Sequence, residues 1–302
     1  MTIYNGTQRA LELEVALRQQ VVALAQRGVY LSIAAILFGE DSGSRLYTRL
    51  KAETAQQVGI EYRVFRFSLQ DDVSKIQAKI SELNADYTVT GIIIQKPWRK
   101  TWQNATRAGE SSKTAYDQWW LELVSTLSVA KDVDGLHPQT LQAIKDGTWK
   151  EQGKVLPATA SAVLTIMEDF AASQNKPLTA YNTSIIGISD LLGRPLFFEL
   201  KSRGVACELL GRKGLQEKMA SGDALTKSDI IVSATGVEGL ITGSLIGKGS
   251  ALVDVGEPRP DVDINSVIKA NKASFITPVP GGVGPLTIVS LLQNAVVLAN
   301  HA

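Results

Sequence analysis

The chain has 302 residues and a formal net charge of +1, from 31 basic and 30 acidic side chains. Its length exceeds the usual size of one domain and therefore predicts two domains with sizeable cores. The even charge balance argues against nucleic acid or an anionic membrane as a partner, because both attract proteins with an excess of cations. We expect no transmembrane helix, because no apolar run reaches transmembrane length. We also expect no secretory signal, because the N-terminus lacks a charged region followed by an apolar stretch.

Cysteine and histidine are scarce. Cys207 is the single cysteine, so no internal disulfide can form, which is consistent with a reducing, cytoplasmic location. With two histidines, His137 and His301, the chain offers too few nitrogen and sulfur ligands for a zinc site. We therefore expect a cytoplasmic protein without a bound metal.

The first half of the chain alternates between helical and strand patterns. Helices are predicted over 7–27, 45–58 and 73–83, and strands over 33–38, 62–67 and 91–94. Ser44 is the expected N-cap of the second helix, and Gly59 is expected to end it. The apolar side of the first helix is expected to comprise Leu11, Leu13, Val15, Leu17, Val21, Val22 and Leu24. Strands that alternate with helices predict an α/β fold with a parallel sheet.

The alternation restarts after a polar bridge at 146–154. A helix over 161–171 precedes predicted strands at 183–187, 205–210, 229–233 and 251–255. This half therefore favours a separate doubly wound, Rossmann-like nucleotide-binding domain. A last helix is predicted over 286–299.

Residues 97–121 interrupt this order with Trp98, Trp102, Trp119 and Trp120 among many polar residues. The favoured interpretation is a surface excursion anchored by these rings. A lid over a cleft and a subunit contact are the alternatives.

The segment from Thr277 to Thr287 packs three prolines and three glycines into eleven residues. Proline fixes φ and glycine permits φ > 0, so the segment specifies one backbone path whose amides can approach a ligand closely. Pro280, Gly281 and Gly284 are its candidate substrate contacts.

Three polar side chains of the first half have spacing that suits acid–base chemistry. Tyr47 and Lys51 lie four residues apart on one helix face, and Gln95 closes a strand at the edge where α/β sheets bind ligands. A lysine enclosed in a cleft has a lowered pKa and can exchange protons near neutral pH. The alternative is a solvated helix face beside an exposed strand end.

Asp132 and Asp134 alternate with Val133, so in an extended conformation their carboxylates point the same way. This arrangement predicts ligand hydrogen bonds, a bound cation or a shifted pKa. The alternative is an Asp-rich loop that caps the following helix.

Residues 187–195 join a predicted strand to a helix through a glycine-containing turn, where a pyrophosphate would meet the helix N-terminus. The next strand ends at Gly211-Arg212-Lys213, which offers two cations and no acidic residue for a ribose hydroxyl. This pattern favours NADP, with NAD as the alternative.

Four segments, taken together and in this order, resemble the bifunctional methylenetetrahydrofolate dehydrogenase/cyclohydrolase family. They are Gly39–Tyr47 followed by Lys51, Gly91–Gln95, Lys131–Pro138 and Thr277–Thr287. The resemblance implies a folate-binding catalytic domain at 1–156 plus 279–302 and a Rossmann-like NAD(P)-binding domain at 157–278. It also implies a last helix that packs back on the first domain, and a homodimer.

The resemblance assigns roles to the candidate residues. Lys51 transfers protons, Tyr47 positions the substrate and Gln95 orients Lys51. Asp134, supported by Asp132, accepts two parallel N–H bonds from the amino-pyrimidine edge of folate. The implied NADP site comprises Gly187, Ile188, Ser189, Arg212, Lys213, Gly256 and Glu257.

The chain departs from the family pattern at several of these places. Ile188 replaces an arginine that helps to hold the ribose phosphate in NADP-using relatives, and Glu257 lies where the family has Gly-Ile-Asn near the nicotinamide. Gln95 is followed by Lys-Pro-Trp-Arg rather than Leu-Pro-Leu-Pro, and Pro157–Ala160 reads Pro-Ala-Thr-Ala rather than Pro-Cys-Thr-Pro.

The implied function is oxidation of methylene-tetrahydrofolate to the methenyl form with NADP, followed by hydrolysis to formyl-tetrahydrofolate. Two alternatives stay open. One is a cyclohydrolase that has lost NADP binding, motivated by Ile188 and Glu257. The other is a non-catalytic paralogue that binds folate or nucleotide, motivated by the tryptophan-rich insertion.

Overall fold

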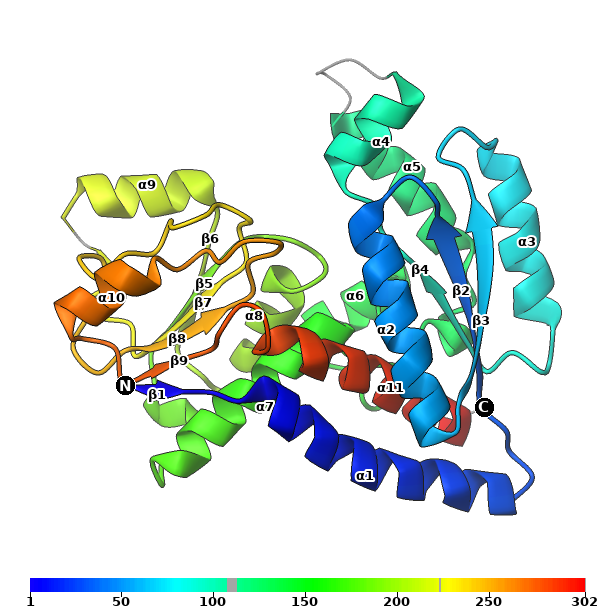
Figure 1. The fold of residues 1–302 in the computed structure, drawn as a ribbon, viewed down its shortest axis with the longest axis horizontal. Helices are drawn as coiled ribbons and strands as arrows, with labels where there is room; N and C mark the ends of the chain where they lie inside the picture. Colours follow the sequence, from blue (N-terminus) through cyan, green and yellow to red (C-terminus); the bar gives the residue numbers. More distant parts are fainter. Residues whose placement is uncertain (108–112, 223, 302) are drawn as a thin grey trace. The chain divides into compact units, whose positions relative to one another are not determined.

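The computed structural model describes residues 1–107, 113–222 and 224–301, and it contains two parallel β-sheets with helices between the strands (Figure 1). The chain divides into two compact units. Unit 1 comprises Met1–Glu12, Ile144–Gly147 and Pro157–Ser290, and unit 2 comprises Leu13–Ala143, Thr148–Leu156 and Leu291–Ala302. The expected α/β class is confirmed.

Unit 2 is built on a three-stranded parallel sheet in the order β3-β2-β4. Its strands are β2 (Ser32–Phe38), β3 (Glu61–Phe67) and β4 (Gly91–Ile94). Every residue of β2 and β4 is buried, which is why both read as continuous apolar runs rather than as alternating patterns. Helices α2 (Ser42–Val58) and α3 (Val73–Ala85) connect these strands, as the sequence predicts.

The cap of α2 corrects one expectation. The N-cap is Asp41 and not Ser44, because the Asp41 carboxylate accepts a hydrogen bond from the Ser44 backbone N–H at 2.8 Å. Ser44 thus lies inside the helix that it was expected to begin. The predicted end is confirmed, since Gly59 adopts a left-handed φ of 88°.

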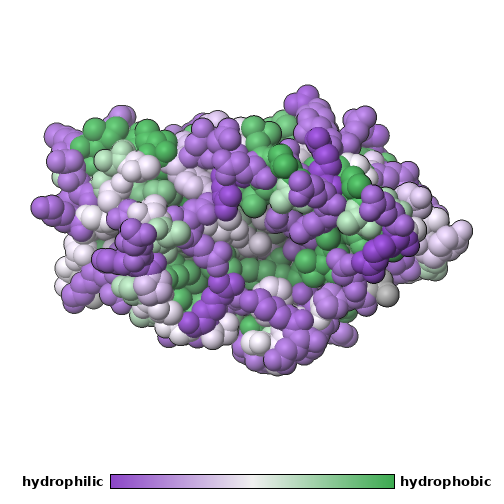
Figure 2. Space-filling model, turned by 90° about the horizontal axis from the view of Figure 1, so that it is seen from below, coloured by the Kyte–Doolittle hydropathy of each residue, from purple (hydrophilic) through white to green (hydrophobic). Residues whose placement is uncertain are grey.

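Helix α1 (Gly6–Gln26) buries a narrower face than its apolar pattern predicts. Leu17, Val21 and Leu24 are buried, whereas Leu11, Val15 and Val22 are exposed. At about 100° per residue these two sets form separate stripes, and one stripe faces solvent. On the face drawn in Figure 2, hydrophobic residues lie at the surface among hydrophilic ones.

The tryptophan-rich segment forms two helices that the sequence did not predict, α4 (Arg99–Thr106) and α5 (Lys113–Thr126). Trp102, Trp119 and Trp120 are buried, and the Trp119 ring lies 5.2 Å from that of Phe38 on β2. Tryptophans therefore anchor this segment to unit 2. Residues 108–112 of the segment lie outside the described residues.

Unit 1 is built on a six-stranded parallel sheet in the order β1-β9-β8-β7-β5-β6. Its strands are β1 (Thr2–Ile3), β5 (Thr183–Ile186), β6 (Cys207–Leu210), β7 (Ile230–Ser233), β8 (Ala251–Asp254) and β9 (Phe275–Ile276). The strand order reverses at β5, whose neighbours are β6 and β7. Such a reversal is where doubly wound sheets bind ligands.

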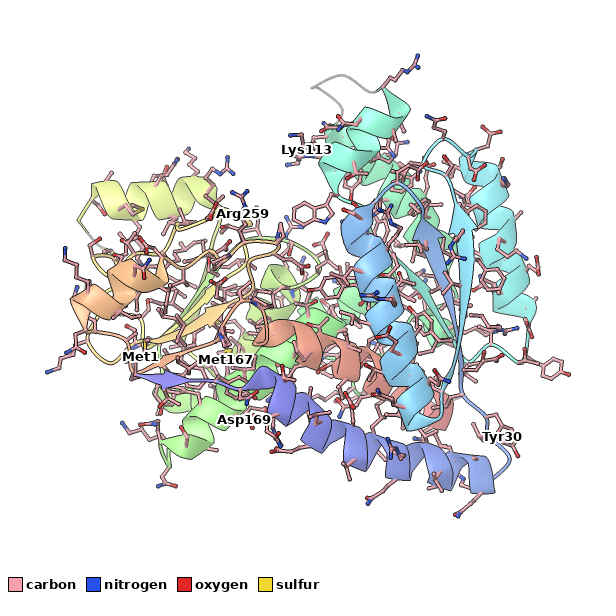
Figure 3. All side chains as sticks on the ribbon, viewed as in Figure 1. Met1, Tyr30, Lys113, Met167, Asp169 and Arg259 are labelled. Atoms are coloured by element: carbon pink, nitrogen blue, oxygen red, sulfur yellow. The ribbon has the colours of Figure 1, made fainter. Side chains whose placement is uncertain are left out.

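The helices of unit 1 and the connecting region complete the fold. They are α6 (Pro138–Lys145), α7 (Ala158–Ser173), α8 (Gly193–Ser202), α9 (Arg212–Ala220) and α10 (Ile264–Ala270), with short 3₁₀ turns at Val129–Lys131 and Leu178–Ala180. Asp169 on α7 ties the N-terminal segment to unit 1, because its carboxylate accepts hydrogen bonds from Tyr4 at 2.6 Å and from Arg9 at 2.9 Å (Figure 3).

The last helix, α11 (Val283–His301), is longer than the predicted 286–299. It also corrects the expectation that no apolar segment is long enough to cross a membrane. Its length and mean hydropathy of 1.5 would suffice for a membrane span. However, 61% of the apolar window is buried inside the protein, as in the core helix of a soluble fold. Within unit 2, Asn294 of this helix donates hydrogen bonds to the carbonyl oxygens of Val133 and Leu156, at 2.9 and 3.0 Å.

Candidate functional site

A buried lysine and a buried glutamine form the centre of the candidate site in unit 2. Lys51 lies on the inward face of α2, and its Nζ donates a hydrogen bond to Oε1 of Gln95 at 3.2 Å. Gln95 follows β4 directly, and its backbone N–H donates to the Ile36 carbonyl at 2.9 Å, which fixes it to the sheet. Tyr47 lies one helical turn before Lys51 and is half-buried. The structure thus brings Lys51 and Gln95 together as the resemblance implies.

Burial lowers the pKa of Lys51, and the charge of Asp134 partly opposes this change. Water solvates an ammonium much better than a protein interior does, so a buried lysine loses its proton more readily. A lysine in this condition can exchange a proton with a bound substrate near neutral pH.

The pKa of Asp134 is shifted in the opposite direction to that of Lys51. Burial raises the pKa of its carboxyl to about 6, while Lys51 and Lys96 lower it and Asp132 raises it. The carboxylate is therefore ionised at neutral pH and becomes protonated in mildly acidic solution. Lys51 and Asp134 thus each favour the charged form of the other, and the pKa values of both lie closer to neutrality than usual.

Asp132 is occupied by its own loop. Its buried carboxylate accepts hydrogen bonds from the backbone N–H groups of Leu136 and His137 at 3.1 and 2.8 Å, and from the Thr140 hydroxyl at 3.2 Å. These donors belong to the start of α6 and the turn before it. Asp132 thus shapes and caps the loop, as the alternative interpretation expected for this motif. The Asp134 carboxylate accepts no hydrogen bond within the described part of the chain.

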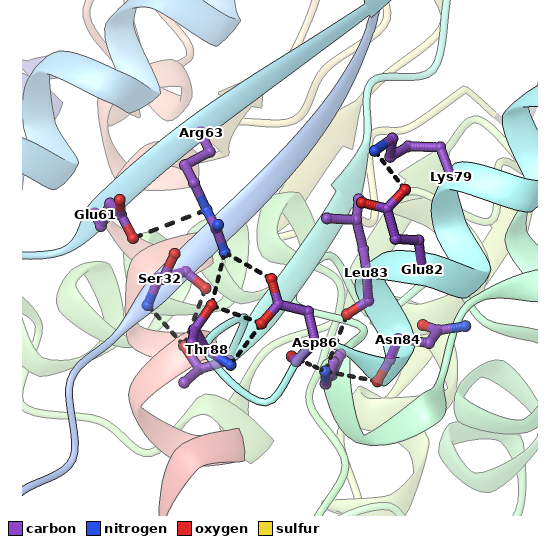
Figure 4. A network of polar contacts seen from close by, with 11 residues as sticks. Ser32, Glu61, Arg63, Lys79, Glu82, Leu83, Asn84, Asp86 and Thr88 are labelled. Atoms are coloured by element: carbon purple, nitrogen blue, oxygen red, sulfur yellow. Dashed lines mark hydrogen bonds and ion pairs between the residues drawn. The ribbon is translucent and has the colours of Figure 1, made fainter.

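Lys131 fixes the start of the loop that carries Asp134. The Lys131 ammonium donates to the carbonyl oxygens of Leu83, Asn84 and Asp86 at the end of α3, at distances of 2.7 to 3.0 Å. Figure 4 shows that the Asp86 carboxylate also accepts a hydrogen bond from the Thr88 hydroxyl and pairs with Arg63. Side-chain contacts therefore fix one of the residues that bind Lys131. Fixing the loop in this way fixes the position of Asp134.

Two residues near this cluster escaped the sequence analysis. The Tyr62 hydroxyl, on β3, is buried beside Gln95 and Asp134, and burial raises its pKa. Neither this hydroxyl nor the Gln95 amide nitrogen meets the geometry of a hydrogen bond within the described residues. The second is Lys96, whose charge acts on Asp134. The sequence carries no signal for Tyr62. At Lys96 the sequence visibly departs from the family pattern, but no role was assigned to this residue.

The candidate cofactor residues of unit 1 lie at the switch point of the six-stranded sheet. Gly187 follows β5 with a φ of 120°, and a Cβ there would lie 2.4 Å from the Ala234 carbonyl oxygen. A Cβ at Gly193, the first residue of α8, would lie 1.7 Å from the Gly187 carbonyl oxygen. Both positions therefore require glycine, as expected for a tight strand–turn–helix junction that receives a pyrophosphate.

The next strand brings a cation to the same edge of the sheet. The Ile188 side chain lies 3.6 Å from where a Cβ of Gly211 would be, and Gly211 directly precedes Arg212 and Lys213 on α9. Lys213 pairs with Glu217 at 3.5 Å, while Arg212 is exposed and has no ion pair within the described residues. The residues present fit a dinucleotide whose ribose phosphate meets Arg212.

Gly256 and Glu257 follow β8 in a loop whose backbone N–H groups donate hydrogen bonds to a single carboxylate. Asp254, at the end of β8, accepts hydrogen bonds from the backbone N–H groups of Gly256, Asp261 and Val262 at 2.8 to 3.1 Å. A Cβ at Gly256 would lie 2.6 Å from the Arg259 carbonyl oxygen, so only glycine fits. Glu257 is half-buried in this loop.

The proline- and glycine-rich segment lies in unit 1 and has the unusual path that its composition predicts. Gly281 has a φ of 98°, and its carbonyl oxygen accepts a hydrogen bond from the Thr7 backbone N–H at 3.2 Å. Pro280 is exposed, and Gly281 and Gly284 are partly exposed. These three residues belong to unit 1, whereas Lys51, Gln95 and Asp134 belong to unit 2.

Comparison with known proteins identifies the family. Residues 4–113 match the tetrahydrofolate dehydrogenase/cyclohydrolase catalytic domain, and residues 157–302 match the NAD(P)-binding domain of the same family. A bifunctional protein FolD of Lactobacillus gasseri is 32% identical over 302 residues, which cover 98% of this chain and 96% of that protein. The chain belongs to the tetrahydrofolate dehydrogenase/cyclohydrolase family.

Solved structures of the tetrahydrofolate dehydrogenase/cyclohydrolase family share the fold. The bifunctional FolD enzyme of Campylobacter jejuni is 28% identical with a TM-score of 0.83, and the similarity covers 100% of this chain and 99% of that one. The Trypanosoma brucei enzyme, solved with NADP and an inhibitor, is 24% identical with a TM-score of 0.82, and it covers 99% of this chain and 97% of that one. The resemblance inferred from four sequence segments is thus confirmed over the whole chain.

Proposed function

We propose that this protein is a bifunctional enzyme that oxidises methylene-tetrahydrofolate to methenyl-tetrahydrofolate with NADP and hydrolyses the methenyl form to formyl-tetrahydrofolate. The observation that carries the proposal is the buried Lys51–Gln95 hydrogen bond beside Asp134 in a member of this family. A buried ammonium of lowered pKa, held by an amide and faced by a carboxylate, is equipped to move protons.

Each residue of the cluster has a distinct task in hydrolysis. Asp134, ionised at neutral pH, accepts N–H groups of the substrate ring and fixes its orientation. Lys51 then exchanges a proton with the bridge nitrogen or with the attacking water as the methenyl bridge opens. Gln95 holds the Lys51 ammonium in place, and Tyr47 lies beside the substrate on the same helix face. Asp132 keeps the Asp134 loop in shape.

For the dehydrogenase step, the chain supplies the binding and orientation of NADP. Gly187, Ile188 and Ser189 form the turn at the pyrophosphate, Arg212 pairs with the ribose phosphate with Lys213 nearby, and Gly256 and Glu257 line the loop after β8. When bound, NADP supplies the hydride acceptor. The family resemblance assigns substrate contacts to the backbone groups of Pro280, Gly281 and Gly284 in unit 1. On the family resemblance we place the domain boundaries at 1–156 plus 279–302 and at 157–278. The compact units differ from these bounds at Met1–Glu12, Ile144–Gly147 and 279–290, which belong to unit 1.

The alternative of a cyclohydrolase without dehydrogenase activity has specific support in two side chains. Ile188 offers no charge to the ribose phosphate, and Glu257 places an acidic group in the loop after β8. The exposed Arg212 and the glycine junction at 187–193 support the bifunctional enzyme instead, as do relatives described as bifunctional.

We also propose, on family resemblance, that the protein is cytoplasmic and forms a homodimer. Light scattering of the purified protein would test the dimer.

Two absorbance assays on the purified protein test the function. Methylene-tetrahydrofolate with NADP should yield NADPH, and methenyl-tetrahydrofolate should lose its absorbance faster than in buffer. Activity in both assays supports the bifunctional enzyme. Hydrolysis without NADPH formation, with either NADP or NAD, would establish the cyclohydrolase alternative, and inactivity in both would contradict the proposal.

A further inference from the structure

Trp98 is the exposed member of the tryptophan-rich segment. Its side chain is 48% exposed, whereas the other three tryptophans of the segment, Trp102, Trp119 and Trp120, are buried. It lies three residues after Gln95, where the family pattern Leu-Pro-Leu-Pro has a leucine instead. Ligands of α/β sheets bind beyond the carboxyl ends of parallel strands. An indole left in solvent just beyond β4 is therefore a candidate ligand contact.

The backbone that carries this indole is fixed on both sides. The Trp98 backbone N–H donates a hydrogen bond to Oδ1 of Asp41 at 3.4 Å, and the Thr101 hydroxyl donates to the same oxygen at 3.0 Å. Asp41 is buried and is also the N-cap of α2, so it joins the starts of α2 and α4. On the other side, the Tyr116 hydroxyl donates to the Pro97 carbonyl oxygen at 2.5 Å. The exposed ring thus has a preorganised base.

The indole lies against Gly43, in the first turn of α2. A Cβ at Gly43 would be 3.1 Å from Nε1 and 3.8 Å from Cδ1 of Trp98, so a side chain there would crowd the ring. Gly43 lies within the helix, where alanine is the better helix former. Glycine at this position therefore makes room for the indole.

Gly43, Tyr47 and Lys51 lie on successive turns of one i, i+4 row of α2. Beyond Lys51 the row is closed, because Ala55, its next member, is 0% exposed. In the other direction Tyr47 and Gly43 are partly exposed. Two steps of this row span about 12 Å along the helix axis. A long ligand whose reacting atoms lie at Lys51 can therefore extend along α2 past Tyr47 to the indole over Gly43.

We propose that Trp98 is a substrate-binding residue whose indole packs against the aminobenzoyl–glutamate tail of the folate. The inference rests on the proposed function, in which Asp134 holds the amino-pyrimidine edge and Lys51 acts on the one-carbon bridge. The tail is the part of a folate that continues beyond this bridge. Its aromatic ring suits the two aromatic side chains that the row presents, because offset or edge-to-face contacts between rings are attractive. Trp98 thus adds a second aromatic contact to that of Tyr47.

The first test uses p-aminobenzoyl-glutamate, which is the tail without the pterin ring. Tryptophan fluorescence of the intact protein is recorded as this compound is added. Saturable quenching is expected in wild type and should be absent in Trp98→Phe. Trp149 is half-buried elsewhere in unit 2, so Trp149→Phe is the matched control and should keep the response. Equal quenching in wild type and Trp98→Phe, or no saturable quenching in wild type, would overturn the inference.

The second test measures hydrolysis of methenyl-tetrahydrofolate. Trp98→Ala should raise the KM about two- to tenfold, as expected for the loss of one aromatic contact, with little change in kcat. Trp98→Phe keeps a ring and should restore most of the loss. Tyr87 is 92% exposed and precedes β4, at the end of the strand opposite to Gln95, so Tyr87→Ala should leave the KM unchanged. A purely structural role of Trp98 would instead lower kcat and the thermal unfolding midpoint.

Gly43→Ala tests the position of the indole in a variant that keeps Trp98. Alanine favours the helix, so the fold should be retained, while its methyl group displaces the ring and should raise the KM. A wild-type KM in both Gly43→Ala and Trp98→Ala would overturn the inference. If p-aminobenzoyl-glutamate quenches Trp98 but the wild-type protein neither oxidises nor hydrolyses folates, the binding role stands and the proposed function fails.

Discussion

The ammonium of Lys51 donates a hydrogen bond to Oε1 of Gln95 at 3.2 Å, between side chains 44 residues apart in the sequence. One side chain comes from the helix that follows β2 and the other from the end of β4, the strand that pairs with β2. A parallel βαβ arrangement is what brings them together. The contact links the fold of unit 2 to its chemistry, because the same burial that forms the core lowers the pKa of the lysine.

Asp134→Asn should weaken folate binding much more than it weakens the fold. A carboxylate that accepts two N–H bonds contributes roughly 1.5–3 kcal/mol per charged hydrogen bond, so affinity should fall at least tenfold. Titration calorimetry with a folate would measure the loss. Affinity equal to wild type would show that Asp134 does not contact the substrate.

Asp132→Ala should weaken the fold more than it weakens folate binding. Three donors in its loop would lose a buried acceptor, which costs roughly 1.5–3 kcal/mol of unfolding free energy. Urea denaturation should therefore show a lower midpoint, whereas Asp134→Asn should not. If the two variants were equally stable and equally impaired in binding, the separation of a shaping and a binding carboxylate would be wrong.

Folate affinity should depend on pH through Asp134. Its pKa of about 6 lies above the usual value for aspartate, so the carboxylate is ionised above pH 6 and protonated below it. Only the ionised form accepts two N–H bonds, and affinity should therefore fall as the pH decreases from 7 to 5. Dissociation constants that are flat over this range in wild type, and also in Asp134→Asn, would contradict the assignment.

Arg212→Ala should reduce the preference for NADP over NAD. Arg212 is exposed and is held by no ion pair within residues 1–107, 113–222 and 224–301, whereas Lys213 pairs with Glu217. One charge-assisted bond to a phosphate contributes roughly 1.5–3 kcal/mol, so the ratio of the two affinities should fall about tenfold or more. Lys213→Ala serves as the matched control and should change the ratio less. A wild-type preference for NAD would remove the phosphate site from α9.

Tyr62→Phe should leave the protein at least as stable as wild type. The buried hydroxyl lies beside the Gln95 amide but forms no hydrogen bond of standard geometry within the described residues, and burying such a group costs about 1–3 kcal/mol. Tyr181 of unit 1 also carries a buried hydroxyl without a partner there, so Tyr181→Phe is the matched control. A marked loss of stability in Tyr62→Phe alone would show that its hydroxyl is bound in solution.

The sequence predicted the long elements and missed the short or mixed ones. β2 and β4 were predicted because buried parallel strands read as apolar runs, while β1 and β9 have two residues each and show no periodicity. Helices α4 and α5 were missed because their buried face is made of tryptophans and a tyrosine among polar residues. The α2 cap was misplaced because Asp41 and Ser44 are both good caps, and only the backbone distinguishes them.

The candidate site was predicted in part. Lys51, Gln95 and Asp134 were proposed from family segments, and the structure brings them into one cluster. Tyr62 could not be proposed, since its nearness to Gln95 is a tertiary relationship between a side chain of β3 and the residue after β4, which the sequence does not show. The different tasks of Asp132 and Asp134 likewise depend on which carboxylate the loop donors reach.

Hydrolysis of methenyl-tetrahydrofolate by Lys51→Met, compared with wild type, tests the account most directly. Methionine has a similar length but no proton to transfer, so the rate should fall by ~10²–10⁴. Folate binding by calorimetry and the thermal unfolding midpoint serve as controls, and both should be retained. Hydrolysis at the wild-type rate by a folded, folate-binding Lys51→Met variant would contradict the assignment of Lys51 as the proton-transferring group.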